Sequence, residues 1–397
     1  MQATTLILVL NAGSSSLKFS LLELPQEREV LKGMAERLGE AQSSFWVHFP
    51  EQKELELPAS AHLPEALSAL KALLSRQNLS PRISAIAHRV VHGGERFKNT
   101  THLTPEVIDV LKSLIPLAPL HNPANIEGIE AALAEWPDLP QYAVFDTAFH
   151  QTMPKVAYRY ALPTSLYTED AIRRYGFHGS SHQFVSARLK ELAPQAAERV
   201  ITAHLGNGCS MAAILNGKSV DTSMGMTPLE GLVMGTRCGD LDPGVLLYLL
   251  TQKGLSPKAV NRLLNKESGL LGLSGLSNDV RSLDRARQEG HTGAALALEI
   301  FAYRAAKAAA ALCVGLGGLD SLVFTGGIGE NAAWVRERIV AHLGFLGLLL
   351  DPELNLGCKA QEARISLHEH PAIWVIPTQE ERLIARESFE KMKAENK

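Results

Sequence analysis

The chain has 397 residues, of which 46% are hydrophobic, enough to build about two globular domains of ordinary size. Its 39 Lys and Arg residues nearly balance 42 Asp and Glu residues, and the net charge of −3 argues against a general nucleic-acid or membrane-surface binder. The four cysteines are scattered without metal-ligand spacing, so neither a disulfide framework nor a zinc site is expected.

The first residues are apolar, but they lack the basic start and the small-residue cleavage site of a signal peptide. No apolar run reaches the roughly 20 residues that span a bilayer. We therefore expect a cytoplasmic protein with no membrane partner.

In the first half, residues 1–24 are predicted to form a strand, a glycine turn and a second strand. Thr104 and Pro105 have the pattern of a helix start, and Asn122 with Pro123 opens another helix. Apolar spacing predicts further elements, which are helices over 63–74 and 126–136 and strands over 83–91 and 142–145.

The second half begins again with a strand, 200–204, a turn over 206–208 and a strand, 211–215, that leads into a hairpin turn at Asn216-Gly217. Beyond it we predict, in order, a helix capped by Asp242, a helix over 292–316, a strand over 322–324, a glycine-rich loop over 325–329 with a helix from Asn331, a strand over 372–376 and a helix from Glu380. The two halves open alike, which suggests a duplicated α/β unit.

The segment "NAGSSSLK", residues 11–18, resembles a phosphate loop at first sight. A P-loop needs a glycine before its lysine and a helix after it, because the loop amides and the helix N-terminus hold the phosphates. Leu17 precedes Lys18, and residues 19–24 favour a strand. We therefore predict a hairpin that presents the Asn11 amide, serine hydroxyls and the Lys18 cation; a plain serine-rich turn is the alternative.

Two more glycine-rich segments follow predicted strands, "HLGNGCSMAAI" at 204–214 and "FTGGIGEN" at 324–331. Glycine lets the backbone approach a ligand closely. One such turn has a structural explanation more often than not, but three of them at strand ends favour one composite nucleotide site.

Two arginines, Arg89 and Arg237, lie in glycine-flanked turns. A guanidinium pairs bidentately with carboxylate or phosphate and stabilises charge on a transferring phosphoryl group. For either arginine alone, a structural ion pair is the commoner role. His178 has a similar glycine setting, whereas a helix-capping or packing role is nearly as plausible for His121.

Two acidic residues complete the candidate set. Asp146 ends a strand, where metal-linked and catalytic acids often lie, although a structural cap is the alternative. Glu380 begins a helix after the last strand and is a candidate Mg²⁺ ligand, because magnesium prefers oxygen donors and keeps several waters.

These segments, in this order, together resemble the acetate kinase family: "LVLNAGSSSLKFSL", "HRVVHGGE", "PLHNP", "FDTAFH", "YGFHGSSH", "HLGNGCS", "DTSMGMTPLEGLVMGTRCGDLDPG", "FTGGIGEN" and "PTQEE". The resemblance extends from residue 6 to residue 381. It implies an α/β fold of two duplicated ribonuclease-H-like (actin-like ATPase) domains with a nucleotide cleft between them. The first domain would be residues 1–150 completed by the C-terminal helix 382–397, and the second, nucleotide-binding domain would be residues 151–381.

The resemblance also implies the activity: reversible, direct in-line transfer of the γ-phosphoryl group of ATP to acetate, giving acetyl phosphate and ADP. The implied partners are these substrates, Mg²⁺ (or Mn²⁺ in its place) and a second copy of the chain in a homodimer. Propionate or butyrate kinase is the alternative within the enzyme class. An actin- or Hsp70-like ATPase module is the alternative from another class.

The matching motifs imply roles for individual residues. The catalytic residues would be Arg89, Asp146, His178 and Arg237, of which Asp146 matches the residue assigned to proton transfer. The acetate site would contain Arg89, Val91, Leu120, His121, Phe177 and Pro228. The ATP-binding residues would be Ser14, Ser16, Lys18, His204, Leu205, Gly206, Asn207, Gly208, Asp279, Val280, Arg281, Gly327, Ile328, Gly329, Glu330 and Asn331. The metal residues would be Asn11 and Glu380; Gln379, where asparagine is common in the family, departs from the motif beside Glu380.

Acetate is already ionised at neutral pH, because a carboxylic acid has a pKa of about 4–5. The acceptor therefore has no proton for Asp146 to remove. We hypothesise instead that Asp146 orients Mg²⁺, a water on it, or an arginine.

Overall fold

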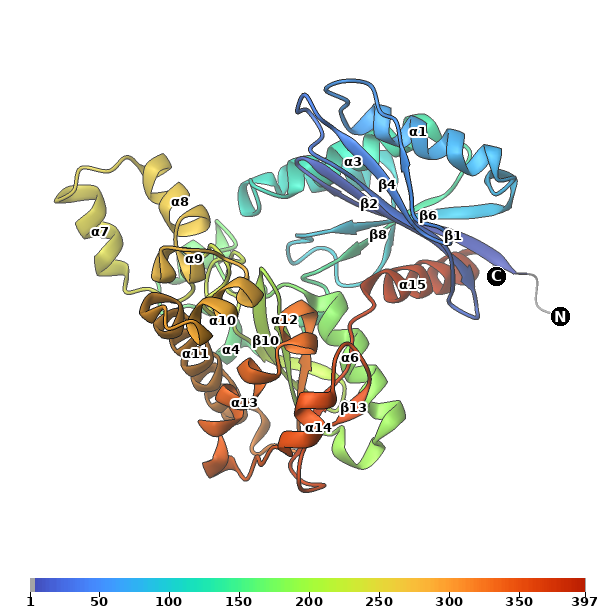
Figure 1. Ribbon diagram of the computed structural model, residues 1–397. Coiled ribbons are helices and arrows are strands. Elements are labelled where there is room, and N and C mark those ends of the chain that lie inside the picture. Colours follow the sequence, from blue (N-terminus) through green and yellow to red (C-terminus); the bar gives the residue numbers. More distant parts are fainter. Residues whose placement is uncertain (1–3, 397) are drawn as a thin grey trace. The chain divides into compact units, whose positions relative to one another are not determined.

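The computed structural model describes residues 4–396, which form two compact α/β units (Figure 1). The first unit contains the described residues up to Phe149 together with those from Gln379 onward, and the second is His150–Thr378. None of the helices among the described residues is both long enough and apolar enough to cross a membrane.

The first unit is built on an eight-stranded sheet with the order β5-β4-β3-β2-β1-β6-β8-β7. Its strands are β1 (Thr5–Gly13), β2 (Ser16–Leu24), β3 (Arg28–Glu36), β4 (Ser44–Phe49), β5 (Lys53–Leu55), β6 (Ile83–Val90), β7 (Thr101–His102) and β8 (Gln141–Phe145). β1 and β2 form an antiparallel hairpin, whereas β1, β6 and β8 run parallel. The carboxyl ends of these three strands therefore share one edge of the sheet, where α/β proteins usually bind ligands.

Helices cover both faces of this sheet (Figure 1). Side chains alternate along β1: Leu8 packs in the core cluster that contains α1 (Leu63–Arg76) and the end of α3 (Asn122–Glu135), whereas Val9 packs with Ile384 of α15 (Glu380–Glu395). α2 (Pro105–Ser113) packs beside α3, and the Thr104 side chain caps it as predicted, accepting from the Val107 N–H. The C-terminal helix α15 thus completes the core of the first unit.

The second unit repeats this plan in a six-stranded sheet with the order β11-β10-β9-β12-β14-β13. Its strands are β9 (Arg199–Leu205), β10 (Cys209–Leu215), β11 (Lys218–Thr222), β12 (Ser321–Thr325), β13 (Ala363–Arg364) and β14 (Ala372–Val375). β9 and β10 form an antiparallel hairpin, and β9, β12 and β14 run parallel, as β1, β6 and β8 do in the first unit. The duplication suggested by the sequence is confirmed in the topology.

The helices of the second unit are α4 (Lys155–Tyr158), α5 (Thr164–Thr168), α6 (Gly179–Leu192), α7 (Pro243–Thr251), α8 (Pro257–Lys266), α9 (Gly269–Ser274), α10 (Val280–Gln288), α11 (Thr292–Leu316), α12 (Gly326–Asn331), α13 (Ala333–Ala341) and α14 (Pro352–Gly357). One local prediction is wrong: the expected loop over 325–329 is instead helical from Gly326. The Glu330 carboxylate accepts a hydrogen bond of 2.9 Å from the Gly326 N–H, which satisfies an amide at the start of this short helix.

Candidate active site

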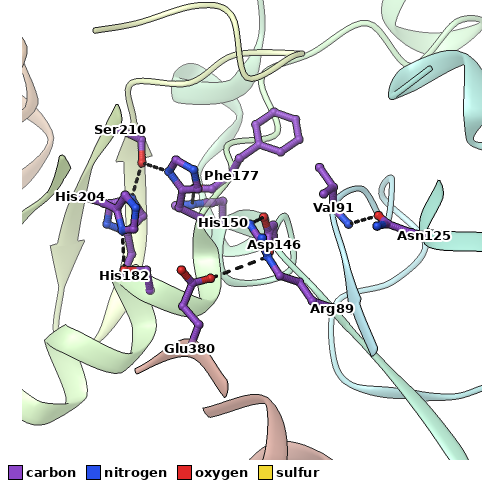
Figure 2. Close-up of polar contacts among 12 residues, drawn as sticks. Arg89, Val91, Asn125, Asp146, His150, Phe177, His182, His204, Ser210 and Glu380 are labelled. Carbon is purple, nitrogen blue, oxygen red and sulfur yellow. Dashed lines mark hydrogen bonds and ion pairs between the residues drawn. The ribbon is translucent and has the colours of Figure 1, made fainter. Parts of the chain in front are cut away.

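Arg89 and Asp146 lie at the carboxyl edge of the first sheet and form a two-bond ion pair (Figure 2). The Arg89 Nε donates to Asp146 Oδ1 at 2.9 Å, and Nη2 donates to Oδ2 at 2.7 Å. Glu380, at the start of α15, places Oε2 3.7 Å from Arg89 Nε. Burial opposes the charge on Arg89, but the carboxylates of Asp146 and Glu380 outweigh it and raise the arginine pKa above its ordinary value. Arg89 is therefore a permanent cation in a fixed orientation.

The β1–β2 hairpin presents an amide and a cation at the same edge. Asn11 lies opposite Lys18 in the strand register, and Ser14 lies exposed in the turn between the strands, close to Ser16. Within the described part of the chain, the side chains of Asn11 and Lys18 have no hydrogen-bond or ion-pair partner. These groups can therefore interact with a ligand, as the predicted hairpin requires.

The donor chemistry of this edge fits magnesium. Among the described residues, no group of three or more His, Cys, Asp or Glu side chains could hold a metal ion. Magnesium, however, is usually held by one or two protein oxygens, with waters and substrate phosphates completing its shell. The unpaired Asn11 amide and the Glu380 carboxylate supply such oxygens.

The segment after β6 is fixed by an asparagine that the sequence patterns did not single out (Figure 2). Asn125 Oδ1 accepts from the Val91 N–H at 2.9 Å, and its Nδ2 donates to the Ala12 carbonyl at 2.8 Å. This buried side chain ties Val91 to β1. Leu120 is 53% exposed, and His121 occupies the N-cap position of α3 without a side-chain capping bond, so the capping role considered as an alternative for His121 is not observed.

In the second unit, His178 and Arg237 converge on the turn between β9 and β10. A Cβ built on Gly208 would lie 2.8 Å from Arg237 Nη2 and 3.5 Å from His178 Nε2. Arg237 Nη1 donates to the Pro228 carbonyl at 2.6 Å, and burial lowers the arginine pKa. Arg237 has no carboxylate partner within the described residues. A partly buried cation without a counter-ion is a natural site for an anion.

A cavity of about 1060 Å³ lies beside this turn, and every residue that lines it belongs to the second unit. Its volume suits a nucleotide, since small-molecule sites usually span about 300–1,000 Å³. It brings together eight of the predicted ATP-binding residues, which are Gly206, Asn207, Asp279, Val280, Arg281, Gly327, Ile328 and Asn331. A Cβ on Gly327 would meet no atom within 4 Å, so the protein's own packing does not require glycine there.

The cavity also contains residues that sequence patterns missed. The Arg287 guanidinium lies 4.3 Å from the centre of the Trp334 ring, and its Nη2 donates to Asp284 at 2.7 Å. Asp284 and Arg287 lie three residues apart, and opposite charges at this spacing on a helix are a local signal for the ion pair between them. The stacking on Trp334 had no local signal, because α10 and α13 are distant in sequence.

The remaining predicted ATP-binding residues of this unit lie outside the cavity lining. Leu205 is fully buried, and His204 Nδ1 lies 2.8 Å from Ser181 Oγ. The Gly329 carbonyl accepts from Arg336 Nη1 at 2.9 Å. Burial raises the pKa of Glu330, whose carboxylate also accepts from the Thr378 N–H at 3.2 Å. These contacts indicate structural support of the cavity wall.

Asp279 and Arg281 have one another as partners although both border the cavity. Asp279 Oδ1 caps α10 by accepting from the Arg281 N–H at 3.0 Å, and Oδ2 accepts from Arg281 Nη2 at 2.9 Å. The bond from the Arg281 side chain is the main reason that the pKa of Asp279 is lowered.

Phe177, expected in the acetate site, is almost fully buried in the second unit, and its carbonyl lies 3.0 Å from His150 Nε2.

Comparison with known proteins identifies relatives over nearly the whole chain. The model of the acetokinase family matches residues 6–386. Acetate kinase of Deinococcus radiodurans is 52% identical over 385 residues, which cover 96% of each chain. The crystal structure of Porphyromonas gingivalis acetate kinase superposes with a TM-score of 0.92 at 44% identity, covering 98% of this chain and 100% of that one. A propionate kinase from Francisella tularensis superposes with a TM-score of 0.93 at 43% identity, covering 96% of this chain and 98% of that one. The fold expected from the sequence is thereby confirmed.

Proposed function

The chain belongs to the acetokinase family, and from that premise we propose that it transfers the γ-phosphoryl group of ATP reversibly to acetate, giving acetyl phosphate and ADP. The observation that carries the proposal is Arg237, a partly buried cation without a carboxylate partner among the described residues, beside a turn that borders a nucleotide-sized cavity. An anionic ligand at this turn would balance that charge.

The residues of the second unit suit stabilisation of a transferring phosphoryl group. The transition state is loose and spreads negative charge over three equatorial oxygens, so catalysis depends on fixed cations and donors. Arg237 and His178 are the candidates, since both side chains approach the space beside Gly208, where a built Cβ would lie 2.8 Å from Arg237 Nη2 and 3.5 Å from His178 Nε2. Gly206 and Asn207, on the same turn, line the cavity in which the nucleotide would bind.

The residues of the first unit suit binding of the acceptor anion. The acetate carboxylate needs a cation and no base, because it is ionised at neutral pH. Arg89 is such a cation, and Asp146 fixes the plane of its guanidinium. The role that we assign to Asp146 is therefore orientation of Arg89 rather than proton transfer.

The proposed metal is Mg²⁺, held by the oxygens of Asn11 and Glu380, with Mn²⁺ as a substitute. When bound, the metal would neutralise charge on the ATP phosphates. Lys18, which lies opposite Asn11 and has no partner within the described residues, would contribute a second positive charge toward the same phosphates.

We also propose that the chain functions as a homodimer. Helix α7 is almost entirely apolar, yet it contains no buried residue. Its exposed side chains include Val245, Leu247 and Tyr248; on α11, Leu296 and Tyr303 are also exposed. Exposed apolar patches of this kind mark association surfaces, and a second copy of the chain is the proposed occupant.

A hydroxamate assay of the purified chain with ATP, Mg²⁺ and acetate, propionate or butyrate tests the proposed function. We expect acyl phosphate with acetate as the preferred acid. Preference for propionate would support the alternative that the similarity to a propionate kinase suggests. ATP hydrolysis without any acyl phosphate would overturn both and favour an ATPase module.

A further inference from the structure

A chain of hydroxyl groups and imidazoles runs from the core of the second unit to His178, and Figure 2 labels two of its members, Ser210 and His182. His178 Nδ1 lies 2.9 Å from Ser210 Oγ, which lies 2.8 Å from His182 Nε2. His182 Nδ1 in turn lies 2.7 Å from Thr202 Oγ1. Ser210, His182 and Thr202 are fully buried. We call these four residues the hydroxyl–imidazole chain.

The direction of hydrogen bonding in this chain follows from counting protons. Burial lowers the pKa of His182 well below its ordinary value, so its ring is neutral and carries one N–H. The Thr202 hydroxyl has one proton, and His182 is its only hydrogen-bond partner among the described residues. A buried hydroxyl donor that lacks an acceptor is destabilising. Thr202 therefore donates to His182 Nδ1.

The other two bonds then have one consistent arrangement. Because Nδ1 of His182 accepts, its proton is on Nε2, and Nε2–H donates to Ser210 Oγ. The Ser210 hydroxyl proton is then directed to His178 Nδ1, which accepts. In the reverse direction, His182 would donate to Thr202, and the buried Thr202 hydroxyl would have no acceptor.

We propose that Thr202, His182 and Ser210 are positioning residues that hold the His178 imidazole as the tautomer protonated at Nε2. The Nε2–H is then a donor next to Gly208, where Arg237 Nη2 also lies. The receiving group, an oxygen of the transferring phosphoryl group, rests on the proposed function. The opposite tautomer would present a lone pair and repel that oxygen.

The backbone of His178 supports this assignment. His178 has φ 55° and ψ 28°, the left-handed conformation, immediately before α6. A residue other than glycine adopts it at an energetic cost, which persists where the surroundings fix the side chain for function. The bond to Ser210 is one such constraint.

Nitrogen NMR of the full chain labelled with ¹⁵N-histidine tests the tautomer without reference to activity. The two ring nitrogens of a neutral histidine differ strongly in chemical shift, and the His178 signals are assigned by their loss in His178→Gln. We expect wild-type His178 to be protonated at Nε2. A wild-type His178 protonated at Nδ1, or at both nitrogens at neutral pH, would overturn the proposal.

Variants of the chain separate positioning from simple structural support. Ser210→Ala removes the donor to His178, and we expect a mixture of tautomers with kcat lowered about 10- to 100-fold, the usual effect of losing an orienting partner. The KM values for ATP and acetate should change little. His182→Gln keeps an N–H near the Nε2 position and should retain the tautomer and most of kcat, whereas His182→Met should lose both.

These outcomes are distinguishable from failure of the proposed function. If the wild type makes no acyl phosphate, the proposed function fails, while the tautomer of His178 is still measured. Full kcat in Ser210→Ala, together with an unchanged tautomer, would overturn the role of the hydroxyl–imidazole chain. If His182→Met does not fold, the wild-type spectrum and Ser210→Ala still decide the question.

Discussion

The two oxygens of Asp146 each accept a hydrogen bond from the guanidinium of Arg89, at 2.9 and 2.7 Å. Asp146 is 2% exposed and Arg89 about one-fifth exposed, so the pair is shielded from bulk water. Of the three partners considered for Asp146 from the sequence (a metal, its water or an arginine), this contact favours the arginine. This contact supports the proposed role of Asp146, which is to orient the Arg89 guanidinium.

Asp146→Asn should weaken acetate use without changing the response to magnesium. An amide removes the negative charge and sets an NH₂ group against a guanidinium N–H, so Arg89 should move. Since misplacing a binding group by 1 Å can cost about 10²-fold, we expect kcat/KM for acetate to fall by about that factor. The measurement is steady-state kinetics at varied acetate and varied Mg²⁺. Unchanged activity, or a change confined to the magnesium dependence, would contradict this role.

Arg237→Ala should lower kcat more than either KM. Its guanidinium lies at the β9–β10 turn beside His178, where transition-state charge would develop in the proposed reaction. Removing one such donor typically lowers kcat by about 10²–10³. Arg237→Lys, which keeps the charge but loses the bond pattern to the Pro228 carbonyl, is the control and should be intermediate. Near wild-type turnover in Arg237→Ala would refute the assignment.

The sequence was sufficient to predict what depends on local pattern and strand order. The hairpin predicted over 1–24, of which residues 1–3 lie outside the described part, the helix cap at Thr104 and the strand before Asp146 follow from short-range signals. The predicted turn placement of Arg89 is wrong, because Arg89 lies within β6. Once the strands are parallel neighbours, Arg89 and Asp146 must share an edge. The expected duplication also follows from two hairpins of the same kind.

What depends on contacts between distant segments was not predictable in this way. Asn125 joins Val91 to Ala12 through two bonds that no spacing rule signals. The stacking of Arg287 on Trp334 likewise joins two separate helices. The glycines after β12 predict a loop, because glycine disfavours a helix, but the Glu330 bond to the Gly326 N–H stabilises the helix start.

Gly327→Ala should weaken nucleotide binding and leave the fold intact. The added methyl group would meet no protein atom within 4 Å but would project from a residue that lines the cavity. Alanine also favours a helix by about 0.5–1 kcal/mol relative to glycine, so the melting temperature should be equal or higher. We expect the KM for ATP to rise about tenfold, a change of about 1.4 kcal/mol in binding.

Gly344→Ala is the matched control for this change. Gly344 also has no atom within 4 Å of a built Cβ, but it does not line the cavity. It should leave the KM for ATP unchanged. If both substitutions raised the KM for ATP equally, the effect of Gly327→Ala could not be assigned to a nucleotide bound against residue 327, and the prediction would be wrong.

The free energy of unfolding should decrease as the pH falls from about 6.5 toward 4. Burial lowers the pKa of His88 to about 4, and that of His150 likewise to about 4. In the unfolded chain a histidine titrates near pH 6.5, so between these values the unfolded state binds protons that the folded state does not. The stabilisation is fully present above pH 6.5 and is lost during acidification.

Urea unfolding at pH 7 and pH 5 measures this loss for His88→Gln and for His48→Gln. Removing His88 should reduce the difference between the two pH values by on the order of 1 kcal/mol, because one titrating group is gone. His48 is exposed, so its replacement should leave the difference unchanged. A pH difference that is identical in wild type and His88→Gln would contradict the prediction.

Leu247→Asp should convert a dimer into a monomer. Leu247 is 63% exposed on α7, a helix whose apolar side chains are not buried within the chain. A carboxylate at this position would lose its hydration on association, and the apolar contact of Leu247 would be lost as well, so both changes oppose dimer formation. Leu367→Asp, at a residue 54% exposed elsewhere in the second unit, is the control and should remain dimeric. Light scattering across a concentration series measures both, and a monomeric wild type, or a dimeric Leu247→Asp, would exclude α7 as the dimer contact.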